Sequence, residues 1–330
     1  MSYCSENRLP LNTSRKRLFE IIELLGYQKA KDPLKIEGQM ASYYWDGSND
    51  EISFVGIELH VYKHDDCISV QTRTRVGRSY WDLQQQNKTI SLLKSIFGGD
   101  FSTDEGNNRY MSIDNEEPSK LACSIYVARW RFHNAIIHAK IYLDSRELKG
   151  DIAKDKSTGF LWLDSMNPRL LSNSMILPYL IGCWESYFRQ LYVSVLKYAD
   201  GISEKALKNV RVSNDDILSV IRNGWDLADI VAEGLSFQRP NIINENFKQL
   251  DSNIKIHTWL SKPYHRRKQT LFDSITVLVE KRDLVVHTGY TDVSLFDKEL
   301  DRIISDLTEA ANRVYNGLGE VYGFTPSYNF

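Results

Sequence analysis

Hydrophobic residues follow both strand and helix periodicities in the first 150 residues. Residues 13–25 carry apolar side chains at helical spacing and stop at Gly26, which predicts an opening helix. From Ile52 to Val76, apolar and polar residues alternate on both sides of Asp65-Asp66, which predicts a β-hairpin with one apolar and one polar face. Further helices are predicted over 80–97 and from Pro118 to about Ile141. The N-terminal half should therefore be an α+β domain.

Beyond residue 168 every periodic segment is helical. The predicted helices cover about 174–198, 213–222, 226–235, 240–250, 265–286 and 294–318, and no strand pattern interrupts them. Between the halves, the stretch from Leu148 to Pro168 loses periodicity and gathers Gly, Lys, Asp and Ser. We therefore expect an α+β recognition or regulatory domain of unknown family over 1–150, a linker over 151–168, and an all-α helical bundle over 169–330.

Composition indicates the cellular compartment of the protein more than its activity. The formal net charge is −2, so a nucleic-acid surface would have to be a local patch. The four cysteines lie far apart with no CxxC pair, which favours a reducing compartment and argues against a metal site. The first residues lack the apolar core of a signal peptide, and no apolar run is long enough for a membrane span. A cytoplasmic protein without a membrane segment is expected.

One short motif combines residue types suited to phosphate chemistry. In the segment EKRDLVVHTGY, Arg282 is followed by Asp283, and His287 comes five residues after the arginine. In its helical context this segment resembles the motif of the HEPN superfamily, which is an arginine, a polar residue, three further residues and a histidine. Glu185, in the aromatic-rich segment WESYF, resembles an acidic residue that some members place against the motif arginine. The resemblance covers roughly Leu170 to Leu318.

The resemblance implies a metal-independent endoribonuclease that uses no cofactor. In such a reaction the 2′-OH of RNA attacks the neighbouring phosphorus. A histidine can act as base or acid, and an arginine can stabilise the charged phosphoryl oxygens. One chain supplies only one motif histidine, and the family pairs two motifs across a homodimer. Asp283 would orient the motif or be a solvated charge, and Glu185 would position Arg282.

Helix geometry sets a condition on this assignment. Residues five apart on an ideal helix point about 140° away from each other, so Arg282 and His287 share a face only if the helix unwinds before His287. The alternative is structural: Arg282 pairs with a neighbouring acid and His287 caps a helix C-terminus.

The resemblance also suggests a biological role and a competing one. A toxin or antiviral defence effector fits it, with the N-terminal domain recognising a trigger, a substrate RNA, or a partner such as an antitoxin. The competing interpretation is a non-catalytic HEPN-type module that binds RNA or nucleotide or assembles a complex.

Two basic clusters are further candidates for RNA binding. With a two-residue turn at Asp65-Asp66, Glu58 lies opposite Arg73, and the polar hairpin face carries a line of arginines. A solvated sheet face with a cross-strand ion pair explains the same pattern. The second cluster is expected to open the helix that ends in the motif, where a bound anion would compensate its charge. The candidate RNA-binding residues are Arg73, Arg75, Arg78, Arg266 and Arg267.

Overall fold

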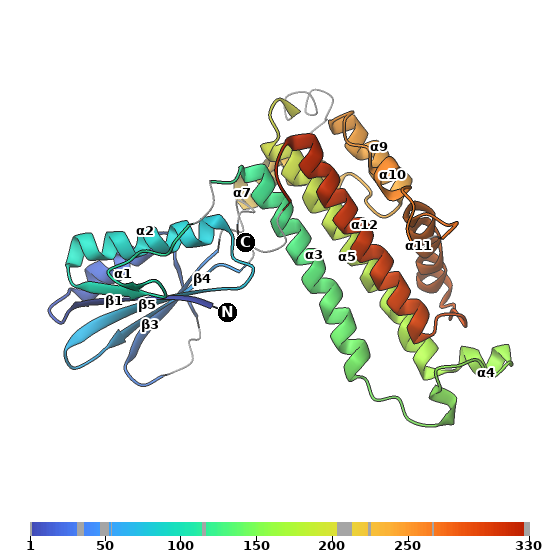
Figure 1. Ribbon diagram of the computed structural model, residues 1–330, viewed down its shortest axis with the longest axis horizontal. Coiled ribbons are helices and arrows are strands. Elements are labelled where there is room, and N and C mark those ends of the chain that lie inside the picture. The colour runs from blue at the N-terminus through green and yellow to red at the C-terminus, as the bar shows by residue number, and fades with distance from the viewer. Residues whose placement is uncertain are drawn as a thin grey trace. The chain divides into compact units, whose positions relative to one another are not determined.

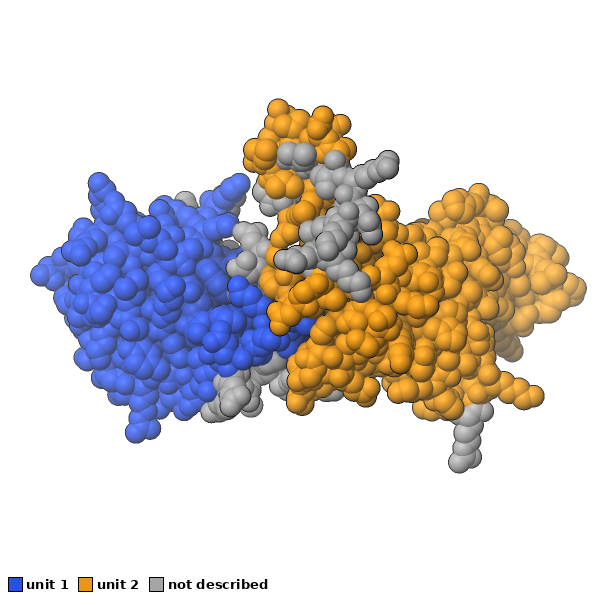
Figure 2. Space-filling model, turned by 90° about the horizontal axis from the view of Figure 1, so that it is seen from above, with its two compact units in different colours: residues 1–127, 327–330 blue, residues 128–326 orange. Residues whose placement is uncertain are grey.

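The computed structural model describes residues 2–31, 36–46, 53, 55–113, 117–202, 213–223, 226–265 and 267–326. The chain divides into two compact units, residues 1–127 with 327–330 and residues 128–326 (Figure 2). An antiparallel sheet dominates the first unit and helices make up the second. The expected order of an α+β part followed by a helical part is confirmed. No described helix combines the length and apolar character needed to cross a membrane.

The first unit is a seven-stranded antiparallel sheet in the order β2-β3-β4-β5-β1-β6-β7. Helices α1 (Arg15–Leu24) and α2 (Tyr80–Phe97) cover one face of it (Figure 1). Leu18 and Ile22 of α1 join a core of apolar side chains from β3, β4 and β5. The strands are β1 (Ser2–Pro10), β2 (Gln28–Lys29), β3 (Gln39–Trp45), β4 (Ile57–Lys63), β5 (Cys67–Arg75), β6 (Asp100–Thr103) and β7 (Gly106–Asn107).

The predicted hairpin is confirmed as β4 and β5, with Glu58 opposite Arg73 as expected. The structure adds β1, which the sequence did not predict and which pairs with β5 over nine residues. The sequence does not predict this strand because two of its buried positions, Ser5 and Asn7, carry polar residues. Ser5 shares a 2.5 Å hydrogen bond with Thr72, and Asn7 donates to the Ile90 carbonyl at 3.2 Å. Internal hydrogen bonds thus let a strand without apolar alternation lie inside the unit.

A buried carboxylate closes the N-terminus of α2. Asp82 is fully buried and accepts hydrogen bonds from the Ser79 backbone N–H at 2.7 Å and from the Ser53 hydroxyl. Burial raises the pKa of Asp82 to about 6, and the hydrogen bonds from Ser53 and Ser79 oppose the rise only in part. The group therefore binds a proton more tightly in the folded chain than in the unfolded one.

We expect this carboxylate to make the unfolding free energy depend on pH between about 4 and 6. Because its folded pKa is raised, its stabilising contribution is complete below the unfolded pKa of about 3.9 and is lost as the pH rises through the folded pKa. A shift of this size corresponds to roughly 3 kcal/mol. Urea unfolding of the wild type and of Asp82→Asn at several pH values should show this decline in the wild type alone. Asp100→Asn, an exposed carboxylate on β6, is the matched control, and parallel pH profiles for all three proteins would contradict the assignment.

The second unit is a helical assembly around α5, which buries Trp184, Tyr187 and Phe188. Helices α8, α9, α11 and α12 all contact α5 (Figure 1). The helices are α3 (Lys120–Ser145), α4 (Leu161–Ser165), α5 (Pro168–Tyr198), α7 (Asn214–Asn223), α8 (Leu227–Glu233), α9 (Pro240–Leu250), α10 (Ile256–Leu260), α11 (Leu271–Thr288) and α12 (Asp297–Tyr322), with a 3-10 turn at Asp151–Ala153.

The boundary between the units lies inside α3, after Val127, rather than near residue 150 where the sequence placed it. The second half of α3 packs on α5, where the Phe132 and Tyr187 rings lie 5.0 Å apart. Arg131 also donates to Gln190 of α5 at 3.3 Å. Most of α3 therefore belongs to the helical unit, although it comes directly after the last strand of the sheet in the sequence.

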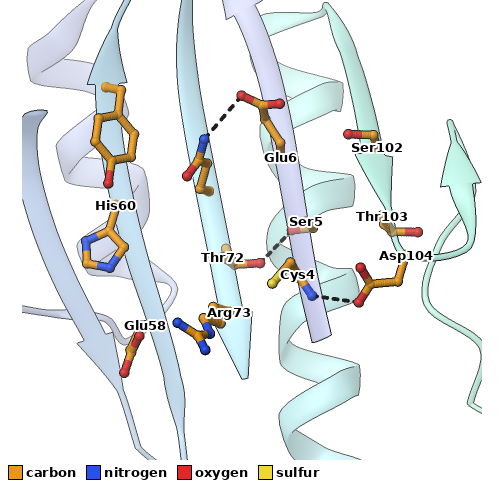
Figure 3. Close-up of a pocket in the computed structure, with 12 residues that line it drawn as sticks. Cys4, Ser5, Glu6, Glu58, His60, Thr72, Arg73, Ser102, Thr103 and Asp104 are labelled. Carbon is orange, nitrogen blue, oxygen red and sulfur yellow. Dashed lines mark hydrogen bonds between the residues drawn. The ribbon is translucent and has the colours of Figure 1, made fainter. Parts of the chain in front are cut away.

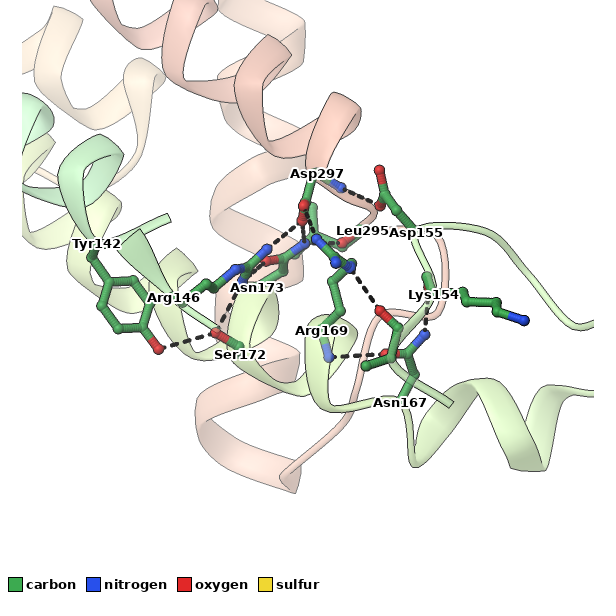
Figure 4. Close-up of polar contacts among 11 residues, drawn as sticks. Tyr142, Arg146, Lys154, Asp155, Asn167, Arg169, Ser172, Asn173, Leu295 and Asp297 are labelled. Atoms are coloured by element: carbon green, nitrogen blue, oxygen red, sulfur yellow. Dashed lines mark hydrogen bonds and ion pairs between the residues drawn. The ribbon is translucent and has the colours of Figure 1, made fainter. Parts of the chain in front are cut away.

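The segment predicted as a linker is anchored by a polar network at the start of α12 (Figure 4). The Asp297 carboxylate pairs with Arg146 and Arg169 and accepts from the Asn173 amide at 3.0 Å. Its backbone N–H donates to Asp155 at 3.1 Å. Residues from the end of α3, the predicted linker and the start of α5 therefore meet at Asp297, more than 120 residues later in the sequence.

Candidate functional site

Helix α11 carries the Arg282–His287 motif in its last two turns. It begins at Leu271 with a capping box between Thr270 and Asp273, and it ends where Gly289 adopts a left-handed conformation (φ +67°). The Gly289 N–H donates to the Val285 carbonyl at 3.0 Å, so the chain stays helical through Thr288. The unwinding before His287 that a shared face would require does not occur. The helix also begins six residues later than the predicted His265.

Asp283 joins two guanidinium groups at this end of α11. Its Oδ1 accepts from Arg282 at 2.9 Å, and its Oδ2 pairs with Arg239 at 3.3 Å. Burial alone would raise the pKa of Asp283, but the hydrogen bonds from Arg282 and Arg239 outweigh it and hold the pKa below its usual value. Asp283 therefore stays ionised and fixes both arginines. The site carries one excess positive charge over these three residues.

His287 lies exposed in the last turn of α11. Its position is about 40° around the helix from Asp283 but about 140° from Arg282, so within one chain the arginine and the histidine do not share a face. Among the described residues, no hydrogen bond reaches the His287 ring. Three apolar side chains nearby in the sequence are half exposed: Leu284 (51%), Val286 (49%) and Tyr290 (50%).

Among the described residues, Glu185 makes no hydrogen bond or ion pair with Arg282. Its Oε2 instead accepts from the Gln238 amide at 3.1 Å, and the neighbouring Trp184 donates to the Gln238 carbonyl at 3.2 Å. These bonds tie the residue before Arg239 to α5. Glu185 thus positions the loop that carries Arg239, whereas the sequence assigned it to Arg282.

Sequence reasoning missed Arg239, which lies 44 residues before its carboxylate partner. One local signal could have singled it out. Arg239 is the N-cap of α9, where it makes no side-chain capping bond and places a positive charge at the positive end of the helix dipole. An unfavourable cap of this kind indicates a compensating partner, and Asp283 is that partner. The Arg239 side chain remains 52% exposed, so it can still reach an anion.

The arginines proposed for RNA binding have different surroundings. Arg73 is exposed and has no hydrogen bond or ion pair with the described residues. Arg75 pairs with Glu58, and the Arg78 guanidinium lies 3.4 Å from the centre of the Tyr3 ring. Arg267 donates to both carboxylate oxygens of Asp306, which is buried, at 2.8 and 2.9 Å. Arg266 lies outside the described residues.

Two of these findings change the picture of a basic RNA surface. Arg75 and Arg267 have carboxylate partners already, so binding a phosphate would require breaking an ion pair. The cluster around Arg267 also precedes α11, which begins at Leu271, so it does not open that helix as expected. Of the described candidates, Arg73 is the one without a hydrogen bond, ion pair or ring contact. Its role in RNA binding stays a prediction.

Within the described residues, no group of three or more His, Cys, Asp or Glu side chains is arranged to hold a metal ion. Comparison with known proteins adds no relative: no protein-family model, no curated protein and no solved structure matches this chain.

Proposed function

We propose that this chain is a cytoplasmic, metal-independent endoribonuclease of HEPN type whose active site forms between two copies. The observation that carries the proposal is the end of α11, where an exposed histidine follows a guanidinium pair held by one carboxylate. Histidine transfers protons near neutral pH, and arginine forks bind phosphate oxygens. These are the two functions that RNA transesterification needs.

The geometry of one chain favours a site shared by two. Arg282 and His287 lie about 140° apart on α11, so a second copy must bring its own histidine or arginine to complete the set. The half-exposed Leu284, Val286 and Tyr290 would be covered by such a partner. A two-fold axis near His287 would place two histidines in one cleft, one as base and the other as acid.

The proposed reaction is a transesterification within the RNA. One His287 accepts the proton of a 2′-OH as its oxygen forms a bond to the adjacent phosphorus. The bond from phosphorus to the 5′-oxygen breaks, and the second His287 donates a proton to that leaving oxygen. Arg282, with Arg239 beside it, stabilises the added negative charge on the phosphoryl oxygens. The products are a 2′,3′-cyclic phosphate and a 5′-hydroxyl.

We expect the purified protein to cleave RNA in the presence of EDTA and to leave these two end groups. The nucleophile is the substrate's own hydroxyl, so chelation of divalent ions should not stop the reaction. Gel analysis of a labelled RNA, with enzymatic tests of both ends, measures the outcome. A matched substrate with 2′-deoxyribose at the cleaved positions should resist cleavage. Products with 3′-hydroxyl ends, or activity that requires added metal, would contradict the mechanism.

One observation favours a second candidate function. Arg282 already has a carboxylate partner and faces away from His287 within the chain, as expected of a non-catalytic module that binds RNA or nucleotide through Arg239 and Arg282. RNA binding without cleavage, weakened by Arg239→Ala, would favour this candidate. The role as a toxin or antiviral effector, restrained by a regulatory partner, is proposed on the HEPN resemblance alone.

A further inference from the structure

The sheet of the first unit has an open face, opposite α1 and α2, that is hollowed by a pocket of about 480 Å³. Side-chain alternation along β1, β4 and β5 directs Glu6, Glu58, His60 and Arg73 to this face, and Asp104 borders it from the turn after β6. Figure 3 shows the carboxylates of Glu6 and Asp104 toward the β1 and β6 side, with His60 on β4. The pocket thus joins groups of opposite charge from three strands and the turn after β6.

One wall of the pocket consists of two carboxylates that are each held through one oxygen. The Oε1 atom of Glu6 accepts from the hydroxyl of Ser69 at 2.5 Å and from the Gln71 amide at 3.4 Å. Ser69 is fully buried, so its hydroxyl holds the carboxylate firmly in place. Asp104 accepts from the Cys4 backbone N–H through Oδ2 at 2.9 Å. Among the described residues, the second oxygen of each carboxylate has no hydrogen-bond donor.

The opposite wall supplies donors. Arg73 lies between Cys4 and Glu58 in the sheet register, yet the Glu58 carboxylate pairs with Arg75 and leaves Arg73 without a described partner. Nδ1 of His60 lies within hydrogen-bonding distance of the Gln39 amide at 3.1 Å and of the Ser42 hydroxyl at 2.9 Å, so this ring nitrogen is already engaged.

The charges on this face do not suit a nucleic-acid strand. The carboxylates of Glu6 and Asp104 outnumber the guanidinium of Arg73, so a run of phosphates would meet more repulsion than attraction. Tyr62 lines the pocket and already stacks on His64 with ring centres 6.3 Å apart. One face of the Tyr62 ring is therefore not available to stack on a nucleic-acid base. A ligand that carries both a positive and a negative group matches the two walls better.

The spacing of the two walls also suits a small ligand. Glu6 and Arg73 lie on adjacent strands at diagonal positions, about 7–8 Å apart between Cα atoms. Side chains at this spacing can contact opposite ends of one small molecule.

We infer that this pocket binds a small zwitterion, namely a free amino acid or a short peptide. Its ammonium group is held by Glu6 and Asp104, and its carboxylate forms a bidentate pair with Arg73. The site belongs to the first unit and is independent of the proposed ribonuclease site in the second.

Isothermal titration of the full-length protein tests this inference without any activity readout. The probes are glycine, L-leucine, L-glutamate, L-lysine, L-arginine and glycylglycine, with orthophosphate and a single-stranded RNA as the competing ligand classes. We expect saturable binding of at least one amino acid or the dipeptide. Glu6→Gln and Arg73→Met should each weaken it about tenfold or more, because each removes a charged hydrogen bond. Glu20→Gln and Arg15→Met, both exposed on α1, are the matched controls and should bind as the wild type does.

Three results would overturn the inference: no saturable binding of any amino acid or dipeptide, equal binding by wild type and both pocket variants, or RNA or phosphate binding that Arg73→Met removes and Glu6→Gln preserves. The last result would show an anion site. Circular dichroism checks that each variant is folded. If Glu6→Gln unfolds, Asp104→Asn in the exposed turn replaces it as the carboxylate variant.

Discussion

His287→Ala should lower the rate of RNA cleavage at least 100-fold while leaving the fold and the dimer intact. General acid–base catalysis contributes typically about 10²–10⁴-fold, and each His287 of the proposed dimer carries one of the two proton transfers. The side chain is exposed in the last turn of α11 and has no described partner, so its removal should cost little stability. Single-turnover cleavage measures the rate, and size-exclusion chromatography with circular dichroism measures assembly and fold.

A matched control separates catalysis from a general effect of losing a histidine. His138 is exposed on α3, and His138→Ala should cleave RNA at the wild-type rate. Full activity in His287→Ala would show that the motif assignment is wrong. A monomer in solution at micromolar concentration that cleaves RNA would contradict the shared site.

Substitutions of Arg282 and Arg239 test the same proposed active site. Arg282→Ala should reduce cleavage because a phosphate ligand is lost, and Arg282→Lys should recover little because lysine lacks the planar fork. Arg239→Ala should weaken cleavage less, since Arg239 borders the motif from another helix. Equal rates for Arg282→Lys and the wild type would show that charge alone matters at this position.

Asp297→Ala should lower the unfolding free energy of the helical unit by about 3 kcal/mol. Removing one partner of a buried ion pair leaves an uncompensated charge, which costs about 3–5 kcal/mol, and partial exposure of Asp297 favours the lower end. The Arg146 side chain is only 6% exposed, so it cannot regain its hydration without local opening. Urea unfolding followed by far-UV circular dichroism measures the change.

The pH dependence of this network gives a second readout. Burial opposes ionisation of Asp297, but hydrogen bonds from Asn173 and Arg146 prevail and hold its pKa below the ordinary value. Its contribution to stability is therefore present at neutral pH and is lost as the pH falls through the folded pKa. Asp301→Ala, an exposed carboxylate one turn later on α12, should change the unfolding free energy by less than about 0.5 kcal/mol. Equal losses in the two variants would show that the network contributes nothing specific.

Features that depend on local periodicity could be predicted from the sequence. The limits of α2 agree with the prediction at both ends, and so do those of α9. The register of β4 and β5 follows from a two-residue turn and strict alternation, because neighbouring strands joined by a short loop have few ways to pair. The choice of Arg282 and His287 as candidates also needed only local spacing.

Which distant polar groups meet depends on how the helices and strands pack. Ser5 and Asn7 look like surface residues in the sequence, yet hydrogen bonds to Thr72 and Ile90 let β1 lie within the sheet. Arg239 reaches Asp283 across 44 residues, and Glu185 bonds to Gln238 rather than to Arg282. The physical reason is that a polar side chain can satisfy its hydrogen bonds with many partners of equal chemistry. Only the packing of the helices and strands around it selects one, whereas hydrophobic periodicity is set within a single element.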